Sequence, residues 1–296
     1  MVHYTQCPLC GASNSKQALL AKDHTVSQRD FSIWHCDECN GRFTQDAPAE
    51  NEIGAFYASA DYVSHSDTKK GIVNKLYHWV RKRTLVSKRK MAEQYTGLAK
   101  GKILDIGCGT GAFLHEMEEA GWQTSGLEPD VNARIKAQEL YSIYPQEPSA
   151  LFQLDEKAYD VISMWHVLEH VHDLQGYLQK ISKLLSPNGK LFIAVPNYTS
   201  HDAAVYNQYW AAWDVPRHLY HFSPASMETL LKKFGLKIIA YKPMWYDSFY
   251  VSMLSEKYKA GKTNLINACW NGFVSNLKAM GDKKKCSSII YVIERG

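Results

Sequence analysis

The sequence of 296 residues lacks most features that mark specialised classes of protein. It holds no apolar run near the roughly 18 residues of a membrane span, and no signal pattern follows Met1. Its net charge of +4 is not gathered into the dense basic stripe of a dedicated nucleic-acid binder. Internal repeats and low-complexity segments are also lacking. We therefore expect an ordinary cytoplasmic globular protein with one large domain and a small one.

Cysteines are few, but four of the seven form two Cys-x-x-Cys pairs. Cys7 with Cys10, and Cys36 with Cys39, place two thiolates each on a tight turn, and two such turns supply the ligands of tetrahedral zinc. A redox dithiol or four unrelated thiols are the alternatives, but a redox motif is not expected twice at this spacing. The pairs predict a zinc ribbon over residues 1–50. It acts either as a structural cap or as a reader of a partner or substrate.

A glycine-rich turn follows a short apolar stretch at residues 102–106. Gly107, Gly109 and Gly111 stand at alternate positions, and apolar residues then recur at helical spacing, which predicts strand, tight turn and helix. Glycine lets the backbone approach a ligand where a Cβ would clash, and a helix N-terminus offers unpaired N–H groups. Such a turn is typical of a site for an adenosine-type ligand.

Two acids indicate which ligand binds. Asp105 would repel the pyrophosphate of a dinucleotide, whereas S-adenosylmethionine (SAM) has no phosphate and carries a sulfonium and an ammonium. Glu128 closes a second predicted strand at 123–127, where a carboxylate can take both ribose hydroxyls. The predicted cofactor-binding residues are Asp105, Gly107, Cys108, Gly109, Gly111, Glu128 and Trp165.

The stretch Leu104-Asp-Ile-Gly-Cys-Gly-Thr-Gly111, followed by Gly126-Leu-Glu128, resembles the first two motifs of class I SAM-dependent methyltransferases. The resemblance extends over residues 101–296 and implies a doubly wound, Rossmann-like α/β sheet of seven strands. Bacterial sugar C-methyltransferases and zinc-bearing ribosomal-RNA guanine methyltransferases share the order of ribbon and methyltransferase, so the resemblance fixes no substrate. Strands are expected at 102–106, 123–127, 141–144, 160–164, 190–195, 237–241 and 287–293.

Histidines gather after the strand expected at 160–164. The segment Leu168-Glu-His-Val171 resembles the "LEHV" segment of small-molecule methyltransferases related to those that methylate ubiquinone precursors. Neutral imidazole is the usual base at pH 7, so His166 and His170 are the predicted catalytic residues. Alternatively, Glu169 and His170 brace the following helix.

Two insertions interrupt the alternation of strands and helices. The connection at 197–224 is long and aromatic, and it is either a packed covering loop or a wall that binds a polar acceptor. The insertion at 243–286 is expected to be helical, as a lid or a dimer surface. The predicted acceptor-binding residues are Tyr209, Trp213, Arg217, His218 and His221.

A helix-period apolar stripe predicts a helix at 72–95 within a helical linker or cap over residues 51–95. Its basic cluster around residues 81–83 and 88–90 is either a solvated face or a surface for a phosphate-bearing substrate, RNA or anionic lipid. The SAM-dependent methyltransferase domain is expected over residues 96–296.

These patterns together predict an enzyme that transfers the methyl of SAM to a small polar metabolite by O-, C- or N-methylation. The predicted cofactors are SAM and zinc, and the predicted partner is a small-molecule acceptor. An RNA methyltransferase, or a non-catalytic module that binds SAM or zinc, is the alternative. The sequence lacks the signatures of amino-directed nucleic-acid methylation and of cytosine C5 methylation, which disfavours nucleic acid. The oligomeric state stays open.

Overall fold

The computed structural model describes residues 1–57 and 72–296, with side chains described from residue 80 in the second range. Part of the predicted linker at 51–95 lies outside the described residues. The strands are β1 (Ser15–Lys22), β2 (Asp30–Cys36), β3 (Gly41–Thr44), β4 (Lys102–Ile106), β5 (Gln123–Leu127), β6 (Tyr159–Trp165), β7 (Leu185–Pro196), β8 (Tyr220–His221), β9 (Leu236–Pro243) and β10 (Ser288–Arg295).

Eight α-helices and six short 3₁₀ helices connect these strands in the described part of the chain. None of these helices combines the length and the apolar character that a membrane crossing needs. The α-helices are α1 (Ile72–Thr96), α2 (Ala112–Glu119), α3 (Val131–Tyr141), α4 (Leu174–Leu184), α5 (His201–Tyr206), α6 (Pro224–Lys232), α7 (Asp247–Ala260) and α8 (Leu265–Gly281). The 3₁₀ helices are η1 (Ile53–Tyr57), η2 (Pro148–Gln153), η3 (Leu168–His170), η4 (Asn207–Tyr209), η5 (Ala211–Trp213) and η6 (Lys283–Lys285).

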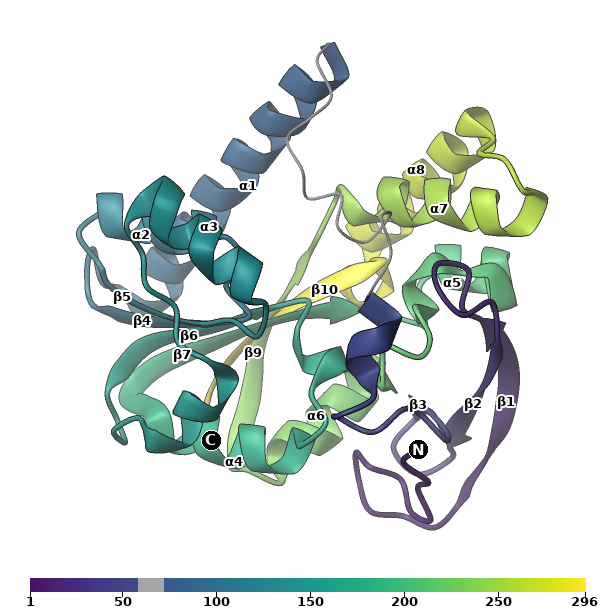
Figure 1. The fold of residues 1–296 in the computed structure, drawn as a ribbon, viewed down its shortest axis with the longest axis horizontal. Helices are drawn as coiled ribbons and strands as arrows, with labels where there is room; N and C mark the ends of the chain where they lie inside the picture. Colours follow the sequence, from purple (N-terminus) through teal and green to yellow (C-terminus); the bar gives the residue numbers. More distant parts are fainter. Residues whose placement is uncertain (58–71) are drawn as a thin grey trace. The chain divides into compact units, whose positions relative to one another are not determined.

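The central sheet has the strand order β5-β4-β6-β7-β10-β9, and β4 pairs in parallel with both β5 and β6. The predicted Rossmann-like α/β fold is thereby confirmed. Strand β4 is buried from Ile103 to Ile106, as expected for a strand covered on both faces. In Figure 1, α2 and α3 lie above the strands β4 to β6, and α4 lies below them.

The sheet has six strands among the described residues, because no strand forms at 141–144. Helix α3 continues to Tyr141 and ends at Ser142, whose backbone is left-handed with φ of 56°. Only Gln146 then pairs with the sheet edge, donating to Gly126 O and accepting from Glu128 N at 2.9 Å each. Proline has no N–H, so Pro145 and Pro148 on either side prevent a longer ladder.

The chain divides into two compact units, and they do not follow the predicted domain boundaries. One unit comprises residues 66–167, 175–193 and 292–296, and the other comprises 1–65, 168–174 and 194–291. The second unit contains a four-stranded sheet of order β1-β2-β3-β8. Its last strand comes from the predicted insertion at 197–224, so the ribbon is completed by residues far along the chain.

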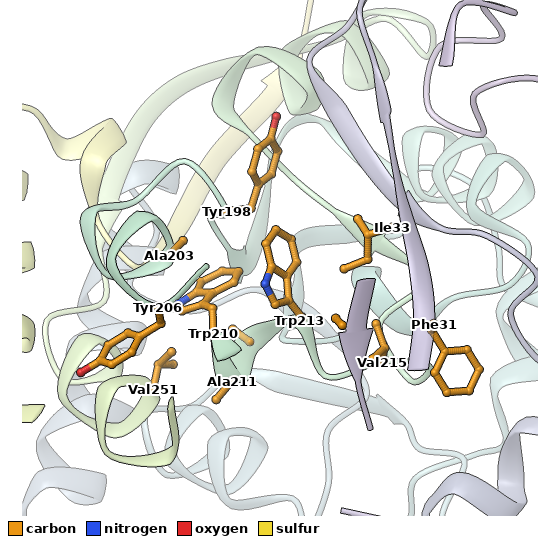
Figure 2. Packing of buried hydrophobic residues seen from close by; sticks show 12 residues of the cluster. Phe31, Ile33, Tyr198, Ala203, Tyr206, Trp210, Ala211, Trp213, Val215 and Val251 are labelled. Atoms are coloured by element: carbon orange, nitrogen blue, oxygen red, sulfur yellow. The ribbon is translucent and has the colours of Figure 1, made fainter. Parts of the chain in front are cut away.

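The ribbon shares its apolar core with that insertion. Phe31 and Ile33 of β2 lie in one cluster with Trp210, Trp213 and Val251, all buried (Figure 2). A segment of about 45 residues cannot bury a sufficient core alone. Strands β1 and β2 therefore gain their apolar partners from α5, η5 and α7 rather than from an independent ribbon core.

This shared core predicts that Ile33→Ala destabilises the whole second unit by about 2–5 kcal/mol, because the substitution leaves a cavity at a fully buried site. Urea unfolding followed by tryptophan fluorescence measures the change, since Trp210 and Trp213 lie in the same cluster. The matched control is Leu20→Ala, at a 53% exposed position of β1, which should change stability by less than about 0.5 kcal/mol. An unaltered tryptophan transition in Ile33→Ala would contradict the shared core.

Candidate active site

The glycine turn joins β4 to α2 with three left-handed residues. The φ angles of Gly107, Gly109 and Gly111 are 72°, 55° and 77°. A Cβ at Gly107 would collide with the side chain of Val167, whereas a Cβ at Gly109 would meet open space. The turn is held by Gly107 N and Cys108 N, which donate to Leu127 O at 2.7 and 3.1 Å. The space beside the Gly109 Cα is therefore open.

Two buried carboxylates stand beside this turn. Asp105, 1% exposed, accepts a hydrogen bond of 2.6 Å from the Ser163 hydroxyl on the neighbouring strand β6. Glu128, 7% exposed, accepts hydrogen bonds from the N–H of Gly109 at 2.8 Å and from that of Asp130 at 2.9 Å. The bond to Gly109 ties the end of β5 to the middle of the glycine turn. Each carboxylate keeps lone pairs for further donors.

Burial makes these carboxylates hard to ionise. Burial raises the pKa of Asp105 to about 7, with a further contribution from the Glu128 charge, against the lowering effects of Ser163 and Lys88. Burial also raises the pKa of Glu128, although the N–H groups of Asp130 and Gly109 oppose the shift. A nearby cation would stabilise the ionised forms of Asp105 and Glu128, and a nearby anion would destabilise them. This electrostatic preference fits the sulfonium and ammonium of SAM.

Trp165, at the end of β6, forms an aromatic wall in the same unit. Its ring lies edge-on to Phe113, with centroids 5.5 Å apart, and stacks on Phe192 at 6.5 Å. Lys88 Nζ of α1 lies 4.0 Å from the Trp165 ring centroid. The Trp165 Nε1 is buried and has no hydrogen-bond partner among the described residues. A buried donor without a partner is costly, so it favours a ligand at this place.

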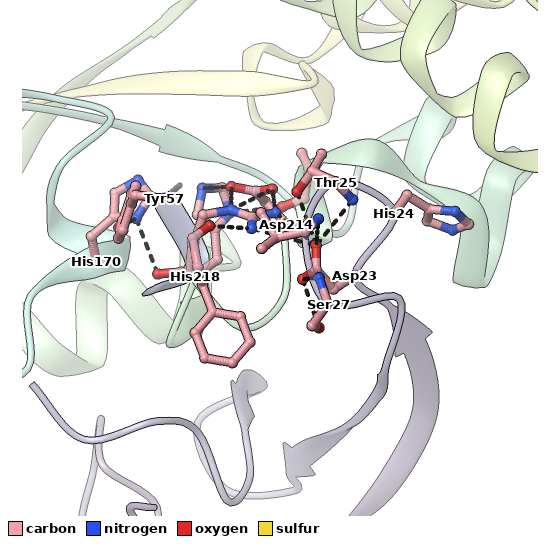
Figure 3. Close-up of polar contacts among 12 residues, drawn as sticks. Asp23, His24, Thr25, Ser27, Tyr57, His170, Asp214 and His218 are labelled. Carbon is pink, nitrogen blue, oxygen red and sulfur yellow. Dashed lines mark hydrogen bonds and ion pairs between the residues drawn. The ribbon is translucent and has the colours of Figure 1, made fainter. Parts of the chain in front are cut away.

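Several predicted acceptor-binding residues belong to a buried network in the other unit (Figure 3). The Arg217 guanidinium donates to Asp214 Oδ1 at 2.6 Å, to Asp23 Oδ1 at 3.3 Å and to Phe56 O at 2.8 Å. Its side chain is 1% exposed. These partners occupy the guanidinium, so the geometry favours a structural role for Arg217 over the predicted contact with an anionic acceptor.

The Asp23 carboxylate is built to stay ionised in this network. It accepts hydrogen bonds from the N–H and hydroxyl groups of both Thr25 and Ser27, at 2.7 to 3.0 Å. Burial raises its pKa, but these donors and the Arg217 charge outweigh burial and lower the pKa to about 2. The network therefore pairs one guanidinium with two carboxylates.

The other predicted acceptor-binding residues are mostly buried as well. His221 Nε2 lies 3.1 Å from Thr44 Oγ1, His218 Nδ1 lies 2.9 Å from Ala212 O, and Trp213 donates to Asn207 O at 2.7 Å. Tyr209 is half-buried, with its ring 6.4 Å from that of His24. Trp213 and Arg217 also line a small pocket with a volume of about 10 Å³, far below the roughly 300 Å³ or more of usual ligand pockets.

The predicted catalytic histidines lie in different units. His166 directly follows β6 and is half-buried, with a left-handed φ of 57° that is uncommon for a side chain of this kind. His170 Nδ1 lies 3.0 Å from both the Tyr57 hydroxyl and Arg217 O. Burial, followed by the charge of His218, lowers the pKa of His170 to about 4.

Among the residues that the structure describes, two groups of side chains meet the distance requirement for a metal. The Sγ atoms of Cys7 and Cys39 are 3.7 Å apart, those of Cys10 and Cys36 are 3.6 Å apart, and all four lie within 4.8 Å of one another. Tetrahedral zinc with bonds of about 2.3 Å places sulfurs about 3.8 Å apart, so the residues fit this ion. Glu169, His170 and His218 also bring one ligand atom each within 4.8 Å.

Comparison with known proteins matches this geometry. Residues 78–241, more than half of the chain, match the family described as "Methyltransferase domain". The chain belongs to this methyltransferase family. The glycine turn, Asp105 and Glu128 all lie within the matched residues. As a SAM-dependent methyltransferase, the chain carries an enzymatic domain, which confirms the prediction from the sequence.

Curated relatives of the methyltransferase have related names. A ubiquinone biosynthesis O-methyltransferase from Nitrosococcus oceani is 30% identical over 186 residues, which cover 58% of this chain and 77% of that protein. One of the same name from Pectobacterium carotovorum is 35% identical over 114 residues, 36% of this chain and 48% of that protein. The chain thus spans about half the length of the second relative.

A solved structure from Galdieria sulphuraria, described as a sarcosine dimethylglycine methyltransferase, has the same fold. Its TM-score is 0.51 at 16% identity, covering 74% of this chain and 87% of that one. At this identity the similarity supports the fold of the methyltransferase and says nothing of its acceptor.

Two residues in the methyltransferase contact the predicted site without having been selected from the sequence. Lys88 belongs to the basic cluster of α1, and its position over Trp165 shows that the cluster is not one solvated face. Tyr57 contacts His170 from η1. The apolar stripe of α1 predicts which face of the helix is buried. It does not predict the direction of a long, flexible lysine side chain, so the contact between Lys88 and Trp165 could not be predicted from the sequence.

The raised pKa of Asp105 predicts that SAM binds more tightly as pH rises. A cation favours the ionised carboxylate, so binding releases a proton whenever Asp105 is protonated beforehand. With a pKa of about 7, affinity should increase by about eightfold between pH 6 and pH 7.5. Titration calorimetry in buffers of different ionisation enthalpy measures both affinity and proton release. In Asp105→Asn the pH dependence should become weaker, with only the contribution of Glu128 remaining, and an equal slope in both proteins would refute the assignment.

Proposed function

We propose that this methyltransferase transfers the methyl of SAM to a hydroxyl oxygen of a small metabolite. The observation that carries the proposal is the glycine turn flanked by two buried carboxylates and the unpartnered Trp165 Nε1. The relatives named for ubiquinone biosynthesis are O-methyltransferases, which supports an oxygen acceptor and a small molecule.

The residues around the turn divide the recognition of SAM among them. Asp105 and Glu128 supply negative charge for the cationic groups and acceptors for the ribose hydroxyls. The charge of Lys88 lowers the pKa of Asp105, so Lys88 favours the ionised form of that carboxylate. Cys108 and Gly111 shape the turn, with Gly111 at the N-terminus of α2. SAM, when bound, supplies an electrophilic methyl carbon, and the protein mainly provides orientation.

We assign the general base to His166 rather than His170. His166 follows Trp165 directly and is half-buried, and a neutral imidazole is the usual base at pH 7. Its left-handed backbone is an outlier of the kind found at functional sites. His170, with a pKa of about 4, is a weak base at pH 7, and Tyr57 and Arg217 O occupy its Nδ1. We therefore assign His170 the role of positioning η3.

The function is tested by S-adenosylhomocysteine release with a panel of phenols, sugars and hydroxy acids. We expect turnover with a hydroxylated acceptor, and in His166→Gln a fall in kcat of about 10²- to 10⁴-fold. The affinity for SAM in calorimetry should stay within about twofold, because His166 acts on the acceptor.

The matched control is His3→Gln, whose imidazole is exposed and lies 2.7 Å from Asp46. It should retain wild-type kcat. Full activity in His166→Gln would remove the proposed base, whereas methylation confined to carbon or nitrogen acceptors would contradict O-methylation itself.

The four-cysteine cluster is proposed to hold one structural zinc ion. Four thiolates complete its coordination and leave no open position for catalysis. Gly41 is required beside it, because a Cβ there would collide with Leu9 and come within 3.2 Å of Cys39 Sγ. Since β1 and β2 also contribute to the shared core, zinc would stabilise more than the ribbon.

We predict one zinc per chain by elemental analysis, and its loss in Cys36→Ser. Chelation or Cys36→Ser should lower the stability of the second unit by at least about 3 kcal/mol, because metal-binding free energy contributes to folding. Cys269→Ser, at an exposed cysteine of α8, is the control and should keep both metal and stability. Metal-free protein with unchanged melting in a chelator would contradict the proposal.

A further inference from the structure

Helix α8 has its large and small residues on unexpected faces. Its buried positions are all small, and the helix forms a hairpin with α7 (Figure 1). At Gly272 an added Cβ would come within 2.7 Å of Phe249 on α7. The buried positions are Ala268, Gly272, Ser275 and Ala279. A helix that needed only this hairpin would place its large apolar residues there instead.

The large apolar side chains of α8 are exposed. They follow one another at alternate steps of four and three residues, which is the 3.5-residue period of a coiled-coil seam. This outer seam consists of Ile266, Trp270, Phe273, Leu277 and Met280, with exposed fractions of 82%, 64%, 48%, 48% and 73%. This spacing is suited to packing against another helix. In a coiled coil each such side chain, the knob, fits into a hole formed by four residues of the facing helix.

The outer seam is large enough for a stable interface. Together with Leu265, 61% exposed, its side chains present roughly 800 Å² of apolar surface, the area that each partner contributes to a standard protein interface. The largest apolar patch of a typical monomer is about 300 to 600 Å². Trp270 and Phe273 lie at the middle of the seam, where aromatic anchors dominate binding energy.

We propose that the outer seam binds the same seam of a second copy of this chain. Helix α8 has no acidic residue and a single basic one, Lys278, whose Nζ lies 2.9 Å from His201 Nδ1. A different partner chosen by charge would find little to recognise on this helix, whereas two identical uncharged seams meet without repulsion. A lipid surface would require cations along the helix, and α8 offers only one.

The lysine residues that follow α8 favour an antiparallel arrangement of the two α8 helices. Lys283, Lys284 and Lys285 are exposed directly after the helix. In a parallel pair the two lysine runs would lie side by side, whereas an antiparallel pair separates them by about 25 Å, the length of a helix of 17 residues. Phe273 is the midpoint of the seam and lies on the two-fold axis. Ile266 then faces Met280 of the second copy.

Light scattering on the full chain at micromolar concentration tests the pairing. We expect wild type at twice 33.7 kDa, and both Trp270→Glu and Phe273→Glu at 33.7 kDa with unchanged circular dichroism. Leu140→Glu, at a 59% exposed position of α3, is the matched control and should stay dimeric. A monomeric wild type, or a dimer that persists in Phe273→Glu, would overturn the proposal. So would a monomer that sediments with phosphatidylglycerol vesicles, which would assign the seam to lipid.

Cysteine cross-linking tests the orientation. In a Cys269→Ser background, the double variant Ile266→Cys/Met280→Cys should form a covalent dimer on oxidation. Ile266→Cys alone should remain non-covalent, because the two copies of residue 266 lie at opposite ends of the helix pair. Efficient cross-linking by Ile266→Cys alone would show a parallel pair and contradict the antiparallel arrangement.

Discussion

The buried guanidinium of Arg217 imposes the strictest constraint on the unit that contains the ribbon. A charge removed from water requires compensation, and Asp23 and Asp214 provide it from segments that are 194 and 3 residues away in sequence. Losing one carboxylate of a buried ion pair costs about 3–5 kcal/mol, because the remaining charge stays uncompensated. The loop after β1, η1 and the connection at 197–224 must therefore come together for this unit to fold.

The glycine turn shows the opposite electrostatic condition. Asp105 and Glu128 are both buried, and the raised pKa of each shows that their negative charge is not fully compensated. A protein that needed only stability would not place two acids there. The cost is consistent with a site that is completed by a cationic ligand. The carboxylates of the other unit differ, because the Arg217 guanidinium pairs with both Asp23 and Asp214.

The parts that the sequence predicts well depend on short-range patterns. The glycine turn, α1 and the strands β4, β5 and β6 appear where expected, because periodicity and turn chemistry act over a few residues. The strand expected at 141–144 was wrong, because the left-handed Ser142 and the nearby prolines permit only one pairing residue. Such patterns could not predict which residues form the shared core, because Ile33 and Trp213 are distant in sequence and come into contact only on folding.

The sequence by itself determined the chemistry: four cysteines at zinc spacing, three glycines with two acids, and histidines after β6. Each of these needs only neighbours along the chain. The tertiary structure alone decided which distant residues contact those groups and how deeply each is buried. It buried Arg217 among carboxylates, carried Lys88 to the face of Trp165 and added β8 to the ribbon. Burial and ion pairing between distant segments depend on the tertiary fold, which the local periodicity of the sequence does not specify.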